Sequence, residues 1–112
     1  MITKKKITVP IFEYDLYIFI FDDYEELHSL IEYKGNPHGL TAIYEDGYSK
    51  VFIKNKCKVG VIPHEALHVK DAIWEYIGYT PQINNDEVDA YLLEFLYKKI
   101  KEVYDKHVKV AE

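Results

Sequence analysis

The spacing of apolar and polar residues divides the chain into a strand-rich first half and a helical second half. β-Branched and aromatic residues dominate 7–9 and 14–21, and Pro10 between them favours a short edge piece followed by a longer strand. Two further strand-like runs, 40–44 and 48–54, are separated by an acidic turn that ends in glycine. We therefore expect two neighbouring strands and then a β-hairpin.

Helices are expected between these strands and after them. Asp22 or Asp23 can cap a first helix that continues to about Tyr33, since acidic residues follow in its first turn. A second helix is expected in the mostly apolar segment 59–77, which ends at a glycine. Pro63 must lie in the first turn of this helix because a proline further inside would clash with the preceding turn.

A last helix is expected after the capping residues of segment 84–86. It carries apolar residues at helical spacing, namely Val88, Leu92, Phe95, Leu96, Ile100 and Val103. The pattern therefore predicts one α+β domain over residues 1–112, with a small mixed or antiparallel sheet, an N-terminal helix and two later helices.

Composition narrows the class of protein. The formal charge is −5, from 14 basic and 19 acidic residues, which argues against nucleic acid as a partner. The longest apolar run, 16–21, is too short to cross a membrane, and no export signal follows the basic start. The single cysteine, Cys57, excludes an internal disulfide. We expect a cytoplasmic protein that interacts with neither nucleic acid nor membrane.

The segment His64-Glu65-Ala66-Leu67-His68 is an HExxH motif within the second predicted helix. Histidines four residues apart lie on one helix face, about 6 Å from each other, and can both reach one Zn²⁺ with bonds of about 2.0–2.1 Å. The carboxylate of Glu65 could then accept a proton from a metal-bound water.

A polar stripe extends this motif along the helix, because His64, His68, Asp71 and Glu75 recur at spacings of four, three and four. Apolar residues surround the stripe, so we expect it to need polar partners in or beside the core. A metal site would supply them. The alternative is that each of these side chains finds a separate hydrogen-bond partner.

A catalytic zinc needs a third protein ligand. Asp71 lies about 10 Å of helix rise beyond His64, too far for a straight helix to bring both to one ion. We therefore expect the ligand from the last helix, where Glu87 is the first choice and Ala90 leaves room for close approach. Lesser candidates, which could instead cap or solvate that helix, are Asp86, Asp89 and Glu94.

The motif and the downstream sequence Asn85-Asp86-Glu87-Val88-Asp89-Ala90-Tyr91 resemble the gluzincin class of zinc metallopeptidases. The order of elements also resembles small HExxH proteins encoded by bacteriophages and prophages. The resemblance implies a minimal zincin-like fold, with His64, His68 and Glu87 as zinc ligands and Glu65 as general base. It further implies that Asp71 orients His68 from outside the ligand shell.

The same resemblance implies hydrolysis of a peptide bond in a peptide or protein substrate. Segment 48–54 occupies the place of the zincin edge strand, along which an extended substrate pairs. Tyr79 is the best candidate to stabilise the oxyanion, with packing as its alternative role. Two other functions stay open: a non-catalytic binding protein of the same architecture, and a phage regulator that cleaves one host protein.

Overall fold

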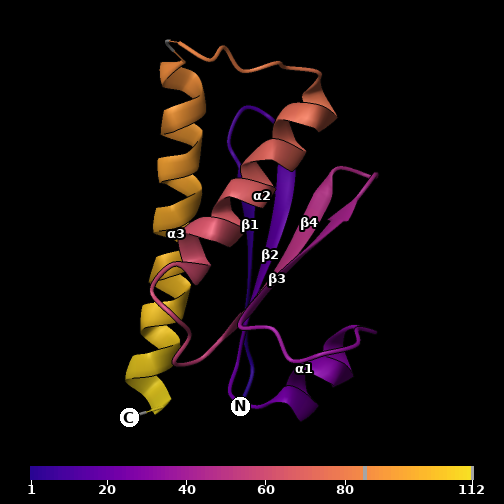
Figure 1. The fold of residues 1–112 in the computed structure, drawn as a ribbon, viewed down its shortest axis with the longest axis vertical. Coiled ribbons are helices and arrows are strands. Elements are labelled where there is room, and N and C mark those ends of the chain that lie inside the picture. The colour runs from indigo at the N-terminus through magenta and orange to yellow at the C-terminus, as the bar shows by residue number, and fades with distance from the viewer. Residues whose placement is uncertain (85, 112) are drawn as a thin grey trace.

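Four strands form one mixed sheet in the computed structural model, which describes residues 1–84 and 86–111 (Figure 1). The strands are β1 (Thr3–Val9), β2 (Tyr14–Phe21), β3 (Gly39–Tyr44) and β4 (Tyr48–Lys54), in the spatial order β1-β2-β4-β3. β1 pairs antiparallel with β2, and β3 pairs antiparallel with β4. The two hairpins are joined by parallel pairing of β2 with β4. The edges of the sheet are therefore β1 and β3.

This order corrects the expectation that segment 48–54 forms the edge strand. β4 has neighbours on both sides, and its central residues Val51, Phe52 and Ile53 are fully buried. Three consecutive buried residues require cover on both faces of the strand, as in the interior of a sheet. The free edge on this side belongs to β3, whose exposed Ile43 reflects its position.

Local sequence signals account for the ends of the helices, which are α1 (Tyr24–Leu30), α2 (Val61–Ile77) and α3 (Glu87–Ala111). Asp23 caps α1 in a reciprocal capping box with Glu26. The helix ends before Ile31, which is extended, and so it is shorter than the predicted helix reaching Tyr33. In α2, Pro63 lies in the first turn as expected, and Gly78 ends the helix in the left-handed conformation at φ 78°.

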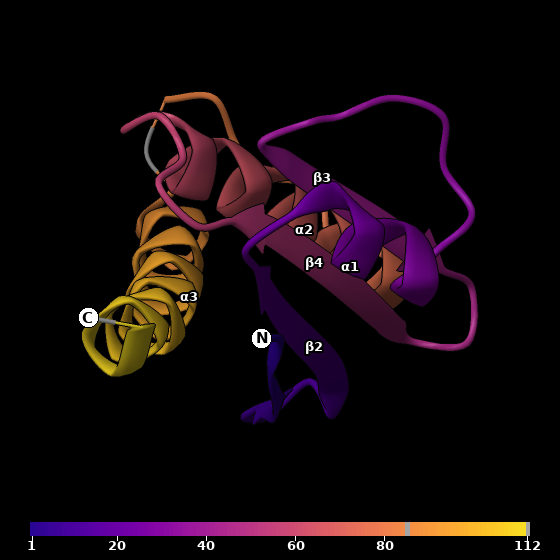
Figure 2. The same cartoon turned by 90° about the horizontal axis from the view of Figure 1, so that it is seen from below.

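The helices cover the sheet unequally. α2 and α3 pack on one face and enclose the main core with residues of β1, β2 and β4. α1 lies near the lower end of the strands in Figure 1 and in front of the sheet in Figure 2, and its Leu27 closes a second cluster with Phe19, Phe21 and Phe52. The predicted α+β class with a small mixed sheet is confirmed.

Candidate metal site on helix α2

The two histidines of the HExxH motif lie together on successive turns of α2. Their Nε2 atoms are 3.1 Å apart, and the ring planes are nearly perpendicular at 81°. Two nitrogen ligands of one tetrahedral zinc, with bonds of about 2.0–2.1 Å, lie about 3.3 Å apart, so this spacing fits a shared metal ion. It also fits a hydrogen bond in which one ring donates to the other.

The polar stripe of α2 faces solvent, which corrects the expectation that it is enclosed by apolar residues. His64, His68, Asp71 and Glu75 are all exposed. The buried face lies on the other side of the helix and includes Ala66, Val69 and Ile73. Leu67 and Ile77, which made the helix appear apolar all round, are each 40% exposed. Burial of polar groups therefore gives no argument for a metal here.

Glu65 differs from the stripe because it lies at the margin of the buried face, beside β3. Its side chain is buried, and Oε1 accepts a hydrogen bond of 2.8 Å from the hydroxyl of Thr41. Gly39 leaves the space for Oε2, since a Cβ atom at Gly39 would lie 2.8 Å from Oε2 and 2.6 Å from Cγ1 of Val61. Sequence reasoning found neither Thr41 nor Gly39, because their roles depend on how α2 crosses the edge strand.

No third ligand completes the histidine pair among the residues that the structure describes. Within them, no group of three or more His, Cys, Asp or Glu side chains is placed to hold a metal. Glu87 is exposed in the first turn of α3. Asp71 is also exposed, and its carboxylate contacts Nζ of Lys70 at 3.3 Å. The ligand roles of His64, His68 and Glu87, and the orienting role of Asp71, therefore stay predictions.

Helix α3 contacts α2 on the flank that carries Lys70 and Trp74. Asp89 accepts a hydrogen bond of 2.6 Å from the Trp74 indole and forms an ion pair of 2.8 Å with Lys70. Burial lowers the pKa of Lys70, but the hydrogen bonds and charges of Asp89 and Asp71 outweigh it, so this pKa is raised overall. Asp89 thus fixes the packing of the two helices.

The other acidic candidates on the last helix also have partners. Asp86 accepts hydrogen bonds of 2.9 Å from the backbone amides of Gln82 and Asp89, so it caps α3. Glu94 pairs with Lys98 one turn along α3. These contacts match the alternative expectation that such acids cap or solvate the helix.

Tyr79 is engaged in the connection between α2 and α3. Its hydroxyl donates a hydrogen bond to Asp86, which raises the pKa of Tyr79, and its ring packs on Trp74 at a centroid distance of 4.6 Å. The packing role is therefore present, whereas its function as an oxyanion-stabilising group stays a prediction.

A hollow of about 390 Å³ lies along α2 at the end of β3. Side chains of both elements line it, among them Ile43, Ala72 and Tyr76. Ala72 follows His68 by one helical turn, so the hollow is close to the motif along the same helix. This surface could receive a side chain of a bound molecule.

A second polar cluster, centred on His107, was not expected. His107 is 1% exposed, its Nδ1 lies 2.7 Å from the Thr3 hydroxyl, and its Nε2 lies 2.8 Å from Oδ1 of Asp22. The hydrogen bond from His107 is the largest cause that lowers the pKa of Asp22 to about 2. Four-residue spacing from Val103 places His107 on the apolar stripe, and this spacing was the available signal.

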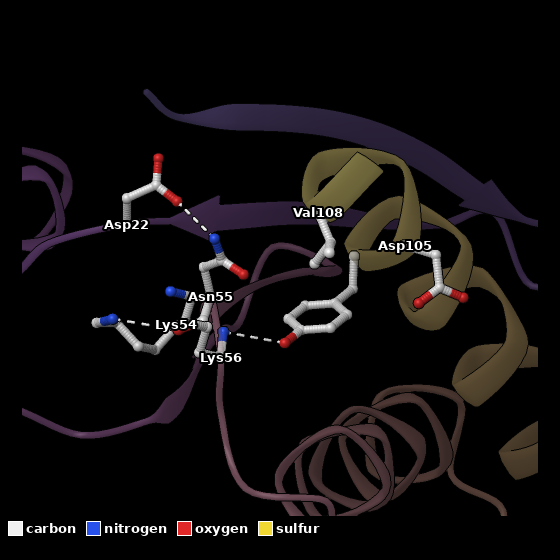
Figure 3. Close-up of a pocket in the computed structure, with 7 residues that line it drawn as sticks. Asp22, Lys54, Asn55, Lys56, Asp105 and Val108 are labelled. Atoms are coloured by element: carbon white, nitrogen blue, oxygen red, sulfur yellow. Dashed lines mark hydrogen bonds between the residues drawn. The ribbon is translucent and has the colours of Figure 1, made fainter. Parts of the chain in front are cut away.

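A hollow of about 650 Å³ lies beside this cluster (Figure 3). Asn55 donates a hydrogen bond of 3.0 Å to Asp22, and the Lys56 amide donates one of 3.0 Å to the Tyr104 hydroxyl. The dashed lines in Figure 3 mark these hydrogen bonds and the one that Nζ of Lys54 donates to the carbonyl of Asn55. They tie the ends of β2 and β4 to α3.

Comparison with known proteins gives no match, whether to family models, to curated proteins or to solved structures. Within the described ranges, none of the helices is both long and apolar enough to cross a membrane.

Proposed function

We propose that the protein is a zinc-dependent hydrolase that cleaves a peptide bond. The observation that carries the proposal is the distance of 3.1 Å between the Nε2 atoms of His64 and His68. That spacing fits two ligands of one zinc, and both rings are open to solvent, so an ion can reach them without a change in the core.

Glu87 is proposed as the third ligand. Its carboxylate is exposed, and within residues 1–84 and 86–111 it takes part in no hydrogen bond or ion pair, but it forms no metal-binding group with the histidines there, so binding one ion with them requires the start of α3 to move toward the pair. His64, His68 and Glu87 would hold the zinc ion, which would supply a Lewis acid and would lower the pKa of water at the site to about 7.

Glu65 is proposed to move the proton. Thr41 holds Oε1 and Oε2 lies in the space beside Gly39, so the carboxylate would have to turn toward solvent to accept a proton from the attacking water and to deliver it to the leaving amine. Thr41 and Gly39 act as positioning residues, since they set where this carboxylate lies relative to β3.

A peptide is the substrate class that the surface supports best. β3 is an edge strand, and it runs beside the glutamate of the motif. An extended peptide can pair with such an edge through main-chain hydrogen bonds, and the hollow near Ile43 and Tyr76 can take one of its side chains.

One observation favours a second candidate function, a non-catalytic binding protein. Glu65 is 5% exposed and hydrogen-bonded, whereas a general base must reach a water. On this alternative the histidine pair binds a metal, or a partner, without hydrolysis.

Elemental analysis of protein purified without chelators tests the proposal. We expect about one zinc per chain, lost in His64→Ala and His68→Ala and retained in the control His28→Ala, whose histidine lies on α1. Absence of zinc from the wild type overturns the metal site.

A peptide-library assay then separates the two functions. The hydrolase proposal expects cleavage by the wild type and none by Glu65→Gln, although the variant keeps its zinc. Zinc without cleavage in both proteins supports the binding function instead.

A further inference from the structure

The sheet face opposite α2 and α3 is only partly covered. α1 and its buried Leu27 close the end that contains Phe19, Phe21 and Phe52. Figure 2 shows α1 in front of the sheet, whereas the buried residues of α2 and α3 belong to the core cluster of the other face. Beyond the end that α1 covers, the described strand positions of this face are exposed or partly exposed.

Lysines and tyrosines alternate across this open area. The strand registers place Lys6 beside Tyr17 and Tyr17 beside Lys50 in one row, with Tyr48 beside Tyr44 in the next. Lys4 lies one row further, beside Phe19. We call these residues the lysine–tyrosine face: Lys4, Lys6, Tyr17, Tyr44, Tyr48 and Lys50.

The tyrosine rings form a continuous aromatic surface. Tyr44 and Tyr48 stack at a centroid distance of 4.5 Å, and Tyr17 meets Tyr48 edge-on at 5.9 Å. All three side chains are partly exposed. Because the three rings are not fully buried, part of each ring remains accessible, and a flat ligand can stack on it.

The lysine ammonium groups lie over these rings. Nζ of Lys4 and Nζ of Lys6 are each 5.7 Å from the Tyr17 centroid, and Nζ of Lys50 is 5.4 Å from that of Tyr44. Exposed contacts of this type are weak, so an ammonium group can turn from a ring to a phosphate at little cost.

The strand positions of this face carry more lysines than acidic residues, although the chain as a whole is acidic. The chain carries a net charge of −5, yet Asp15 is the one acidic residue among the described strand positions of this face. Asp15 is itself bonded to Thr8 and lies 3.8 Å from Nζ of Lys6. Other acids flank the strands at both ends of this face, Glu45 and Asp46 at the hairpin turn and Glu25 and Glu26 in the first turn of α1, which limits a basic footprint to the strands.

We propose that the lysine–tyrosine face binds single-stranded nucleic acid. Unpaired bases stack on exposed aromatic rings in a sequence-tolerant way, while lysines beside the rings neutralise the phosphates that link the bases. An acidic peptide or an anionic membrane would use the lysines but would leave the stacked tyrosines unexplained. The total charge, which argued against nucleic acid, does not describe this face.

Fluorescence anisotropy with a labelled oligothymidylate of about 12 nucleotides tests the proposal at low salt. We expect binding that weakens as salt rises. Lys6→Gln and Lys50→Gln should each weaken binding about 3- to 10-fold and reduce the slope of log affinity against log salt by about 0.7. The matched control is Lys98→Gln, which replaces an exposed lysine of α3. This substitution should change the affinity less than about 2-fold.

The tyrosines are tested separately by a pair of variants. Tyr48→Phe keeps the ring and should bind like the wild type, whereas Tyr48→Leu should bind about 5- to 10-fold more weakly. Circular dichroism and a thermal melt of both variants show whether the sheet is intact. If Tyr48→Leu is unfolded, the two lysine variants still decide the outcome.

Three results would overturn the proposal: no binding at low salt, an equal loss in Lys98→Gln, or tighter binding to polyglutamate or to phosphatidylserine vesicles than to the oligonucleotide. The last result would indicate an acidic peptide or a membrane as the partner. The proposal does not rest on zinc, so His64→Ala should bind the oligonucleotide as the wild type does.

Discussion

The hydroxyl of Thr41 donates a hydrogen bond of 2.8 Å to the carboxylate of Glu65. This contact joins the edge strand β3 to the helix that carries the HExxH motif. Glu65 is 5% exposed, and a carboxylate removed from water needs hydrogen-bond donors to offset its lost hydration. Thr41 therefore determines how stably the motif glutamate is held beside β3.

Replacing Thr41 with the isosteric valine should lower the free energy of unfolding by about 1–3 kcal/mol, because Oε1 of Glu65 then loses its donor. Urea denaturation followed by circular dichroism measures the change. Thr8→Val is the matched control, since Thr8 also donates to a carboxylate, that of Asp15, but at an exposed position. If the two substitutions lower the free energy of unfolding equally, burial of Glu65 adds nothing to the cost of losing the hydrogen bond.

Gly39→Ala should destabilise the protein by about 1–3 kcal/mol, because the new methyl group would collide with Val61 and Glu65 and push α2 from β3. Gly60→Ala is the control: a Cβ atom there meets nothing within 4 Å. Thermal melts of both variants test the difference. A Gly39→Ala protein as stable as Gly60→Ala would mean that α2 does not approach β3 this closely.

The hydrogen bond between His107 and Asp22 predicts that the stability of the fold depends on pH in the acidic range. Hydrogen bonds, first from His107 and then from Asn55 and the amino-terminal group, lower the pKa of Asp22 from 3.8 to about 2, so the ionised carboxylate is favoured in the folded state. Its contribution is present above the unfolded pKa near 3.8 and is lost as the pH falls toward 2. Because the Asp22 side chain is 32% exposed, solvent screening reduces this contribution to about 1–2 kcal/mol.

Asp22→Asn should therefore lower the free energy of unfolding at pH 7, and the difference from the wild type should shrink between pH 4 and pH 2. Urea titrations at several pH values measure it. Asp46→Asn, in the exposed hairpin turn, is the control and should show no such trend. A constant difference at all pH values would contradict the coupling of Asp22 to His107.

Asp89→Asn should destabilise the packing of α2 against α3 by about 2–4 kcal/mol, because the buried ammonium group of Lys70 loses its nearest carboxylate. Asp71→Asn removes the other carboxylate near Lys70, but Asp71 is exposed, so the cost should stay below about 1 kcal/mol. Chemical denaturation of the two variants compares them directly. If Asp71→Asn lowers the free energy of unfolding as much as Asp89→Asn does, the exposed carboxylate of Asp71 stabilises Lys70 as much as Asp89 does.

The elements of the fold were predictable where a local signal fixes them. The aspartate cap of α1, the glycine turn between β3 and β4 and the positions of Pro63 and Gly78 in α2 each act within a few residues of chain. The order of the strands was not predictable in the same way. Parallel pairing of β2 with β4 joins segments that α1 and β3 separate in sequence, so it depends on long-range packing.

The same distinction between local signals and long-range packing applies to the candidate site. The four-residue spacing of His64 and His68 fixes their proximity, because it is a property of one helix. Which face of α2 meets solvent depends on how the helix lies on the sheet, and there the interpretation of the polar stripe was wrong. The contacts of Thr41, Gly39 and Asp89 with α2 likewise arise only when distant segments pack together.

The identity of the third ligand gives the sharpest test of the proposed metal site. Glu87 and Glu94 are both exposed glutamates of α3, seven residues apart, but only Glu87 lies in the first turn. If Glu87 binds zinc, Glu87→Gln should weaken zinc affinity by more than about 100-fold, as loss of a direct ligand should exceed the 10- to 100-fold typical of an outer partner.

Competition with a chromophoric zinc chelator measures this affinity for the wild type, Glu87→Gln, the control Glu94→Gln and Asp71→Asn. We expect Glu94→Gln to match the wild type, and Asp71→Asn to lose about 10-fold if its carboxylate orients His68. A loss of affinity in Asp71→Asn that exceeds the loss in Glu87→Gln would place the ligand on α2 itself. Because Asp71 also contacts Lys70, the stability of Asp71→Asn separates loss of a ligand from loss of packing.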